Sequence, residues 1–178
     1  MTGKLNFVTG WLRRPLCPLE EAQINSSTTR APRRIFCCGR TEAPLPEIKW
    51  DEANPGSNAS ALDEDEKKVR DRFSLPEVNC LGADTHCGCG FRHALLDGKD
   101  WFPIISENEK DINDEKKNHQ DLFDYIISNV NKGRVELFGC WNGDGHEEPL
   151  SITEITCLNL LDDNFYFKER GFYYFVIR

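Results

Sequence analysis

Patterns of apolar and polar residues along the chain predict one clear helix and several strands. Residues 121–130 place their apolar side chains on one helical face, and Gly133 follows as a stop signal. Residues 134–141 alternate between the two faces of a strand. Residues 152–161 carry two competing signals. A capping-box pattern at their start is typical of a helix, but their β-branched side chains favour a strand, and we expect a strand. Shorter strands are expected at residues 4–12, 35–38, 69–73 and 77–81.

Aromatic side chains are concentrated between residue 164 and the C-terminus. Residues 164–168 and 172–178 have the composition of strands, and Glu169-Arg170-Gly171 between them is typical of a turn, so we expect a closing hairpin. Because side chains alternate along a strand, half of the aromatic rings should pack against the helix. The other half should lie on the opposite face of the sheet.

Two long segments lack apolar periodicity. Residues 13–62 are rich in proline and small polar residues and are expected to form irregular connections, whereas residues 106–120 are charged and are expected to form a mobile surface segment. A chain of 178 residues suits one domain, and it contains no internal repeat. The expected fold over residues 1–178 is therefore a single α+β domain, with an antiparallel or mixed sheet packed against one main helix.

Charge and the N-terminal sequence restrict the functional classes. Residues 1–16 have no continuous apolar run and no small-residue cleavage site, so we expect a cytoplasmic protein without membrane association. The first fifty residues hold eight basic against four acidic residues, and residues 51–178 hold fourteen against twenty-six. An acidic body disfavours nucleic-acid binding. The basic stretch Arg30, Arg33, Arg34 and Arg40 has two interpretations, a solvated loop or a phosphate-contact patch. The solvated loop is preferred.

Eight cysteines occur in the chain, and the absence of an export signal favours reduced thiols or metal ligands over disulfides. The densest group lies in His86-Cys-Gly-Cys-Gly-Phe-Arg-His93. Its Cys-x-Cys spacing and its glycines predict that the two sulfurs converge on one side of a turn, because glycine permits positive φ values. Zinc requires about four nitrogen or sulfur ligands. The candidate zinc ligands are Cys80, Cys87, Cys89, His86 and His93, with Cys37 and Cys38 as a further source.

Two other interpretations of this group stay open. The cysteines also suit the role of small buried apolar side chains beside a glycine turn. Alternatively, a thiol activated by His86, Arg92 or His93 would carry redox or nucleophilic chemistry. A second polar cluster, Asp144 to Glu148, offers hard metal ligands or an acid–base pair, but it is interpreted as a turn whose charges face water.

Three motifs together resemble a group of small uncharacterised bacterial proteins. They are Cys87-Gly-Cys-Gly-Phe91, Glu136-Leu-Phe-Gly-Cys-Trp-Asn-Gly-Asp144 and Phe165-Tyr-Phe-Lys-Glu-Arg170. In that group the cysteine turn precedes a helix and a C-terminal sheet, and the similarity covers roughly residues 69–178. No activity is assigned to the group. The resemblance therefore implies one continuous domain and transfers no catalytic or cofactor-binding residue.

Three functional hypotheses follow from the sequence. The first is a non-enzymatic bacterial domain that binds a protein partner and holds a structural zinc ion at the cysteine turn. The second is a thiol-dependent or metal-dependent enzyme that uses Cys87, Cys89 and a nearby histidine. The third is an acidic immunity-type protein that neutralises a basic toxin, which the net charge of −8 permits.

Overall fold

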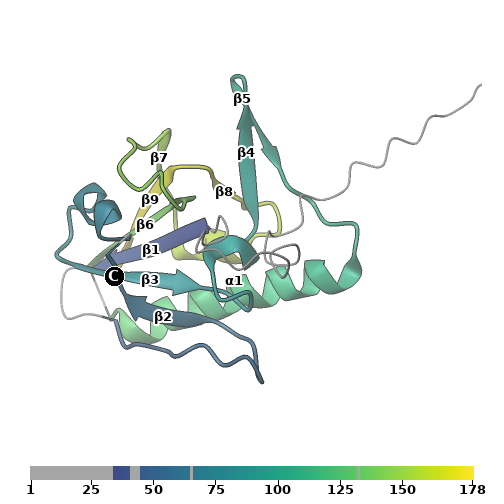
Figure 1. Cartoon of the computed structure of the whole chain (residues 1–178), viewed down its shortest axis with the longest axis horizontal. Coiled ribbons are helices and arrows are strands. Elements are labelled where there is room, and N and C mark those ends of the chain that lie inside the picture. Colours follow the sequence, from purple (N-terminus) through teal and green to yellow (C-terminus); the bar gives the residue numbers. More distant parts are fainter. Residues whose placement is uncertain (1–33, 41–44, 65, 132) are drawn as a thin grey trace, which may run out of the picture. The chain divides into compact units, whose positions relative to one another are not determined.

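The computed structural model describes residues 34–40, 45–64, 66–131 and 133–178 (Figure 1). All of them belong to one compact unit of the chain, Pro32–Arg178. The strand expected at residues 4–12 and the basic residues Arg30 and Arg33 lie outside the described residues.

The described residues form an α+β fold, as the sequence pattern predicted. The single α-helix among them is α1 (Glu109–Asn129), and the 3₁₀ helices are η2 (Glu66–Arg72), η3 (Gly88–Gly90) and η4 (Cys157–Leu161). The strands are β1 (Arg34–Arg40), β2 (Asn58–Ala61), β3 (Glu77–Gly82), β4 (His93–Asp97), β5 (Asp100–Pro103), β6 (Gly133–Trp141), β7 (Ser151–Glu154), β8 (Phe167–Lys168) and β9 (Gly171–Ile177).

The strands form two sheets, both of mixed direction. The larger sheet has six strands in the order β2-β3-β1-β6-β9-β7, and the smaller has three in the order β5-β4-β8. Within them, β7 runs parallel to β9 and β8 runs parallel to β4, whereas the remaining neighbours are antiparallel. In Figure 1, α1 crosses the larger sheet, while β4 and β5 form a hairpin that stands away from it.

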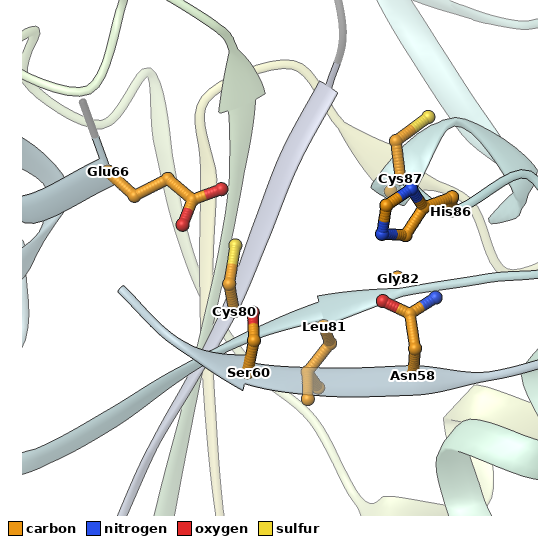
Figure 2. A pocket seen from close by; sticks show the side chains of 9 residues that line it. Asn58, Ser60, Glu66, Cys80, Leu81, Gly82, His86 and Cys87 are labelled. Carbon is orange, nitrogen blue, oxygen red and sulfur yellow. The ribbon is translucent and has the colours of Figure 1, made fainter. Parts of the chain in front are cut away.

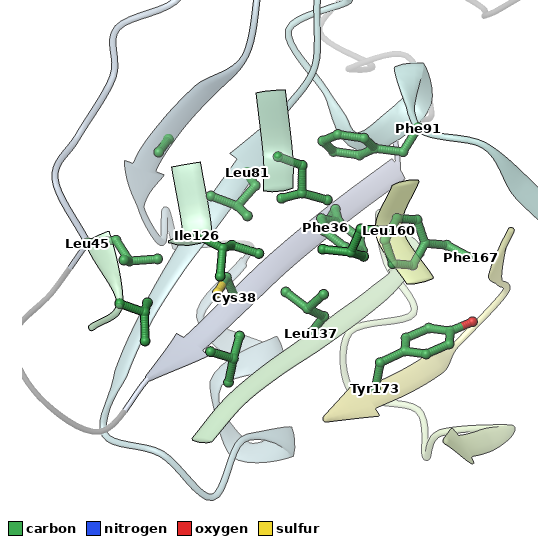
Figure 3. Packing of buried hydrophobic residues seen from close by; sticks show 14 of the residues in the cluster. Phe36, Cys38, Leu45, Leu81, Phe91, Ile126, Leu137, Leu160, Phe167 and Tyr173 are labelled. Atoms are coloured by element: carbon green, nitrogen blue, oxygen red, sulfur yellow. The ribbon is translucent and has the colours of Figure 1, made fainter. Parts of the chain in front are cut away.

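The centre of the larger sheet is buried on both faces. On β6, Val135 and Leu137 belong to the apolar cluster that includes Ile126 of α1. The side chains of Phe138 and Cys140 belong to a second apolar cluster with other partners. Figure 3 shows the first cluster, in which residues from neighbouring strands and from the helix meet. The predicted alternation of β6 is therefore confirmed, but neither face of this strand is left to solvent.

A charged residue also lies inside this sheet. Glu136 on β6 is fully buried. Its carboxylate accepts hydrogen bonds from the backbone N–H of Ser74 at 2.9 Å and from the Ser74 hydroxyl at 2.5 Å, and it pairs with Arg134 at 3.1 Å. These contacts replace the water that a buried carboxylate loses. They fix the loop before β3 to the central strand.

The helix begins earlier than the apolar pattern indicated. Asn108 caps it by accepting a hydrogen bond from the backbone N–H of Lys110 at 3.0 Å, and acidic residues follow in the first turn, as helix starts favour. Residues 109–120, expected as part of a mobile surface segment, are instead the first half of α1. The expectation was wrong because the buried side chains of this half are Asn118 and His119, which are polar and leave no apolar stripe.

Two further expectations, the closing hairpin and the strand at residues 69–73, are also wrong. The closing hairpin does not form, because β8 pairs with β4 while β9 lies between β6 and β7. The Lys168 backbone N–H donates to the Tyr173 hydroxyl at 2.7 Å instead of to a hairpin partner. Residues 69–73 lie largely in η2. That helix begins with a reciprocal cap in which the backbone N–H groups of Asp63 and Glu66 each bond to the other residue's carboxylate at 2.9 Å.

Other expected strands fit better. Strands β1, β3 and β6 cover the expected segments at 35–38, 77–81 and 134–141. Of residues 152–161, only the first three lie in a strand, β7, and residues 157–161 form η4. The β-branched residues thus predicted the strand correctly but not its end.

His119 connects α1 to two other parts of the fold. Its Nε2 accepts the Arg92 backbone N–H at 3.0 Å, so Nδ1 carries the proton and donates to the Leu160 carbonyl at 2.9 Å. The ring also stacks on Phe167. Burial, followed by the positive charge of Arg92, lowers the pKa of His119 to about 4. The neutral ring is therefore part of the folded structure.

This histidine should make stability depend on pH. Its pKa is about 6.5 in an unfolded chain and about 4 in the fold, so its contribution is complete above pH 6.5 and is lost as pH falls toward 4. The shift corresponds to about 3 kcal/mol in the free energy of unfolding. Denaturant melts of wild type and His119→Gln between pH 7.5 and 4 measure it. The variant should be less stable at pH 7.5 and should show a flatter pH dependence.

The exposed His146 provides the matched control, and His146→Gln should follow the wild-type pH dependence. An identical slope in wild type and His119→Gln would contradict the assignment of the pH dependence to this buried ring.

Candidate functional site

The candidate site is the turn formed by residues 83–92, between β3 and β4. The turn is closed by hydrogen bonds from the Ala83 N–H to the Cys87 carbonyl and from the His86 N–H to the Ala83 carbonyl, both at 3.0 Å. His86 takes a left-handed conformation with φ of 61°, which costs an ordinary residue about 1–2 kcal/mol. Its exposed ring stacks on Trp50 with centroids 4.6 Å apart, and the Trp50 indole donates to the Asp84 carbonyl at 3.1 Å.

Cys87 and Cys89 are joined by a disulfide within this turn. The convergence of the two sulfurs is confirmed. The expectation that the cysteines are reduced is wrong for this pair. It was drawn from the inferred compartment, whereas the 3₁₀ turn η3 brings the two Cα atoms to 5.2 Å, within the range that a disulfide spans.

Gly90 of this turn is required by close packing and not by a positive φ. Positive φ values in the turn are confined to His86, and the positive-φ glycines of the described chain lie elsewhere. A side chain at Gly90 would place its Cβ 2.5 Å from the Asp84 carboxylate and 2.6 Å from the Ala83 Cβ. The sequence argument therefore identified the need for glycine here but gave the wrong reason for it.

Helix α1 holds the turn through the buried side chain of Asn118. Its amide nitrogen donates to the Asp84 carboxylate at 2.7 Å and to the Gly90 carbonyl at 2.9 Å. Its oxygen accepts the Asp84 backbone N–H at 3.3 Å. One amide thus connects the two ends of the segment that contains the disulfide.

The two sulfurs of the disulfide have different surroundings. The Cys87 residue is only 7% exposed, and its sulfur accepts the backbone N–H of Cys89 at 3.2 Å and lies 3.6 Å from the Thr85 hydroxyl. Cys89 is more exposed than Cys87. The disulfide therefore joins a buried residue, whose sulfur accepts a backbone N–H, to a residue that is more exposed.

A cavity of about 50 Å³ lies beside the turn. Its lining is mostly polar and comes from β2, η2, β3 and the turn: Asn58, Ser60, Glu66, Cys80, Leu81, Gly82, His86, Cys87 and Gly88. Figure 2 shows Glu66 and Cys80 at one end and His86 and Cys87 at the other. The space suits water molecules or the end of a small ligand.

The candidate zinc ligands are not brought together. Cys87 and Cys89 are bonded to each other, and Cys80 lies beside Cys37 in the sheet. His93 begins β4, and its Nδ1 lies 3.3 Å from the Phe91 carbonyl. Among the residues that the structure describes, no three His, Cys, Asp or Glu side chains are arranged to hold a metal ion. The described part of the chain thus supplies no ligand set for the zinc hypothesis.

The second polar cluster is occupied by ion pairs. Glu148 pairs with Arg72, and Glu147 pairs with Arg170 at 3.0 Å and with His146 at 3.2 Å. Glu148 is largely exposed, so these contacts lie at the surface. They fit a turn whose charges face water, as the sequence indicated.

Sequence reasoning missed three residues of the site. Trp50, Thr85 and Asn118 contribute contacts to the turn, yet Trp50 and Asn118 are 28 or more positions from their partners. Only Thr85, two residues from Cys87, offered a local signal, because a hydroxyl so close to a sulfur can donate to it.

In the described part of the chain, α1 is too polar to cross a bilayer and no other helix has the length. Comparison of the chain with family models, with curated proteins and with solved structures finds no match.

Proposed function

We propose that the chain is a thiol–disulfide exchange protein with its redox centre at Cys87 and Cys89. The observation that carries the proposal is the asymmetry of this disulfide. One of the two cysteines is more exposed, and the sulfur of the other already accepts a hydrogen bond from a backbone N–H. Exchange proceeds by attack of a thiolate on a reachable sulfur, and it is faster when the departing thiolate is stabilised.

The asymmetry assigns a role to each cysteine. A substrate thiolate attacks the Cys89 sulfur, the Cys87–Cys89 bond breaks, and Cys87 leaves as a thiolate. The Cys89 N–H and the Thr85 hydroxyl stabilise that thiolate by donating hydrogen bonds to it. A second substrate thiolate then attacks the substrate sulfur of the mixed disulfide and releases Cys89. Two substrate thiols become a disulfide, and the protein gains two electrons and two protons as its own dithiol.

This disulfide contributes only a little to the stability of the fold. It closes a loop of three residues, and the loop-entropy relation assigns so short a loop about 1.5–2 kcal/mol. The hydrogen bonds of Asn118 and the packing of Gly90 already hold the same turn. The left-handed conformation of His86, directly before Cys87, is a further feature that is common beside reactive groups.

The proposal predicts that the two variants that each lack one cysteine of the pair, Cys87→Ser and Cys89→Ser, behave differently. Pre-reduced protein is mixed with a small model disulfide, and adducts are identified by intact mass. In Cys87→Ser, Cys89 should attack the disulfide and remain in a stable mixed disulfide, because the resolving thiol is missing. In Cys89→Ser, the remaining Cys87 should form the adduct more slowly than Cys89 does in Cys87→Ser, because Cys87 is the less exposed of the two.

Cys157→Ser is the matched control, because Cys157 is a partly exposed free cysteine away from the turn. This variant should turn over the model disulfide at the wild-type rate. Equal adduct formation by Cys87→Ser and Cys89→Ser, or no loss of turnover in either, would contradict the assigned roles.

A second candidate function, binding of a basic protein partner, is favoured by the β4–β5 hairpin. Leu96, Phe102 and Ile105 are exposed apolar residues in and after this hairpin. The net charge of −8 would attract a basic partner and speed its association. An immunity-type protein is the special case in which that partner is a toxin.

Pull-downs from a bacterial lysate at low and moderate salt test this second function. Wild type should retain a stoichiometric basic partner at low salt and lose it as salt rises, because exposed charges are screened. Phe102→Ser should lose the partner at both salt concentrations, whereas Ile152→Ser, at a still more exposed apolar site on β7, should keep it. Recovery of no basic partner, or of one that ignores both salt and Phe102→Ser, would reject this function.

A further inference from the structure

A second pair of cysteines lies inside the larger sheet. Cys37 on β1 and Cys80 on β3 are directly opposite each other in the antiparallel register. Their sulfurs are 3.6 Å apart, and the two residues are not joined by a disulfide. Sulfurs at van der Waals contact need only a short approach to reach the bond length of about 2.05 Å.

The two thiols differ in access. Cys37 is completely buried, whereas Cys80 is 8% exposed and lines the cavity beside the turn. Figure 2 shows the Cys80 sulfur at the same end of this cavity as the Glu66 carboxylate. A small reagent that enters the cavity therefore meets Cys80 and not Cys37.

We propose that Cys37 and Cys80 form a second dithiol–disulfide centre, which small uncharged disulfides oxidise through Cys80. The Cys80 thiolate attacks one sulfur of the reagent, forms a mixed disulfide and releases one reagent thiolate. Cys37 then loses its proton to solvent and attacks the Cys80 sulfur. The Cys37–Cys80 bond forms and the second reagent thiolate leaves. The two protein thiols lose two electrons and two protons, and the reagent disulfide becomes two thiols.

The surroundings of Cys37 explain why it reacts second. Burial raises the pKa of the Cys37 thiol, and the neighbouring Cys80 and the Glu66 carboxylate raise it further. The thiolate is the reactive form, so Cys37 stays inert until a mixed disulfide is held beside it. The charge of Glu66 thus slows closure of the pair. The inference goes beyond the exchange function of Cys87 and Cys89, because it uses different residues and a different step.

Mass spectrometry of protein treated with 2-hydroxyethyl disulfide tests the proposal. The double variant Cys87→Ser/Cys89→Ser removes the first centre, so failure of that centre cannot affect the outcome. After treatment, peptide mapping of this variant should join Cys37 to Cys80 with the loss of two hydrogens at that pair, and any adduct on the partly exposed Cys157 is mapped separately. The same result is expected when Cys140→Ser is added as a control, since Cys140 is buried in the same cluster.

Adding Cys37→Ser to the double variant should leave a hydroxyethylthio group on Cys80, located by peptide mapping, because the resolving thiol is missing. If the folded double variant, verified by circular dichroism, forms neither the Cys37–Cys80 link nor an adduct on Cys80, the proposal is overturned. A stable adduct on Cys80 that Cys37 never resolves would overturn it equally.

A second measurement tests the role of Glu66. Glu66→Gln removes the negative charge, and the amide oxygen still accepts the Asp63 backbone N–H that caps η2. The mixed disulfide on Cys80 should then close about two- to tenfold faster at pH 8, because more of Cys37 is thiolate. A rate equal to that of the parent would overturn the role assigned to this carboxylate.

Discussion

Two neighbouring polar side chains in the middle of α1, Asn118 and His119, fix the part of the fold on which the candidate site depends. Both are almost completely buried, so both have lost water and need partners inside the protein. Asn118 bonds to Asp84 and Gly90 of the turn, and His119 bonds to the backbone of Arg92 at the end of the turn and to Leu160 of η4. Each buried group left without its partner would cost about 1–3 kcal/mol. The turn therefore has one favourable position relative to the helix.

This constraint links the larger sheet, the helix and the Cys87–Cys89 disulfide. One and two turns after His119, Leu122 and Ile126 pack α1 into the apolar cluster of the larger sheet. The same helix thus packs against the sheet through its apolar residues and forms hydrogen bonds with the cysteine turn through its polar residues. With the turn fixed, Cys87 stays buried while Cys89 remains more accessible. The proposed exchange chemistry depends on that difference between the two sulfurs.

Local patterns in the sequence predicted the local structure. They did not predict contacts between residues that are distant in the sequence. The strand at residues 134–141 and the second half of α1 follow from apolar periodicity, and the convergence of Cys87 and Cys89 follows from their spacing. The first half of α1 was missed because polar residues fill its buried positions. The contact between Cys37 and Cys80 joins residues 43 positions apart. It depends on strand register, which a single sequence with several short strands does not specify.

The reduction potential of the Cys87–Cys89 pair tests the central claim most directly. Equilibration of the protein in glutathione buffers of increasing oxidation, followed by alkylation and mass spectrometry, gives this potential. Exchange proteins have potentials between about −270 and −120 mV, whereas structural disulfides lie below about −300 mV. We expect a value above about −270 mV, because hydrogen bonds stabilise the departing Cys87 thiolate. A value below about −300 mV would show that the bond is structural and would contradict the proposed function.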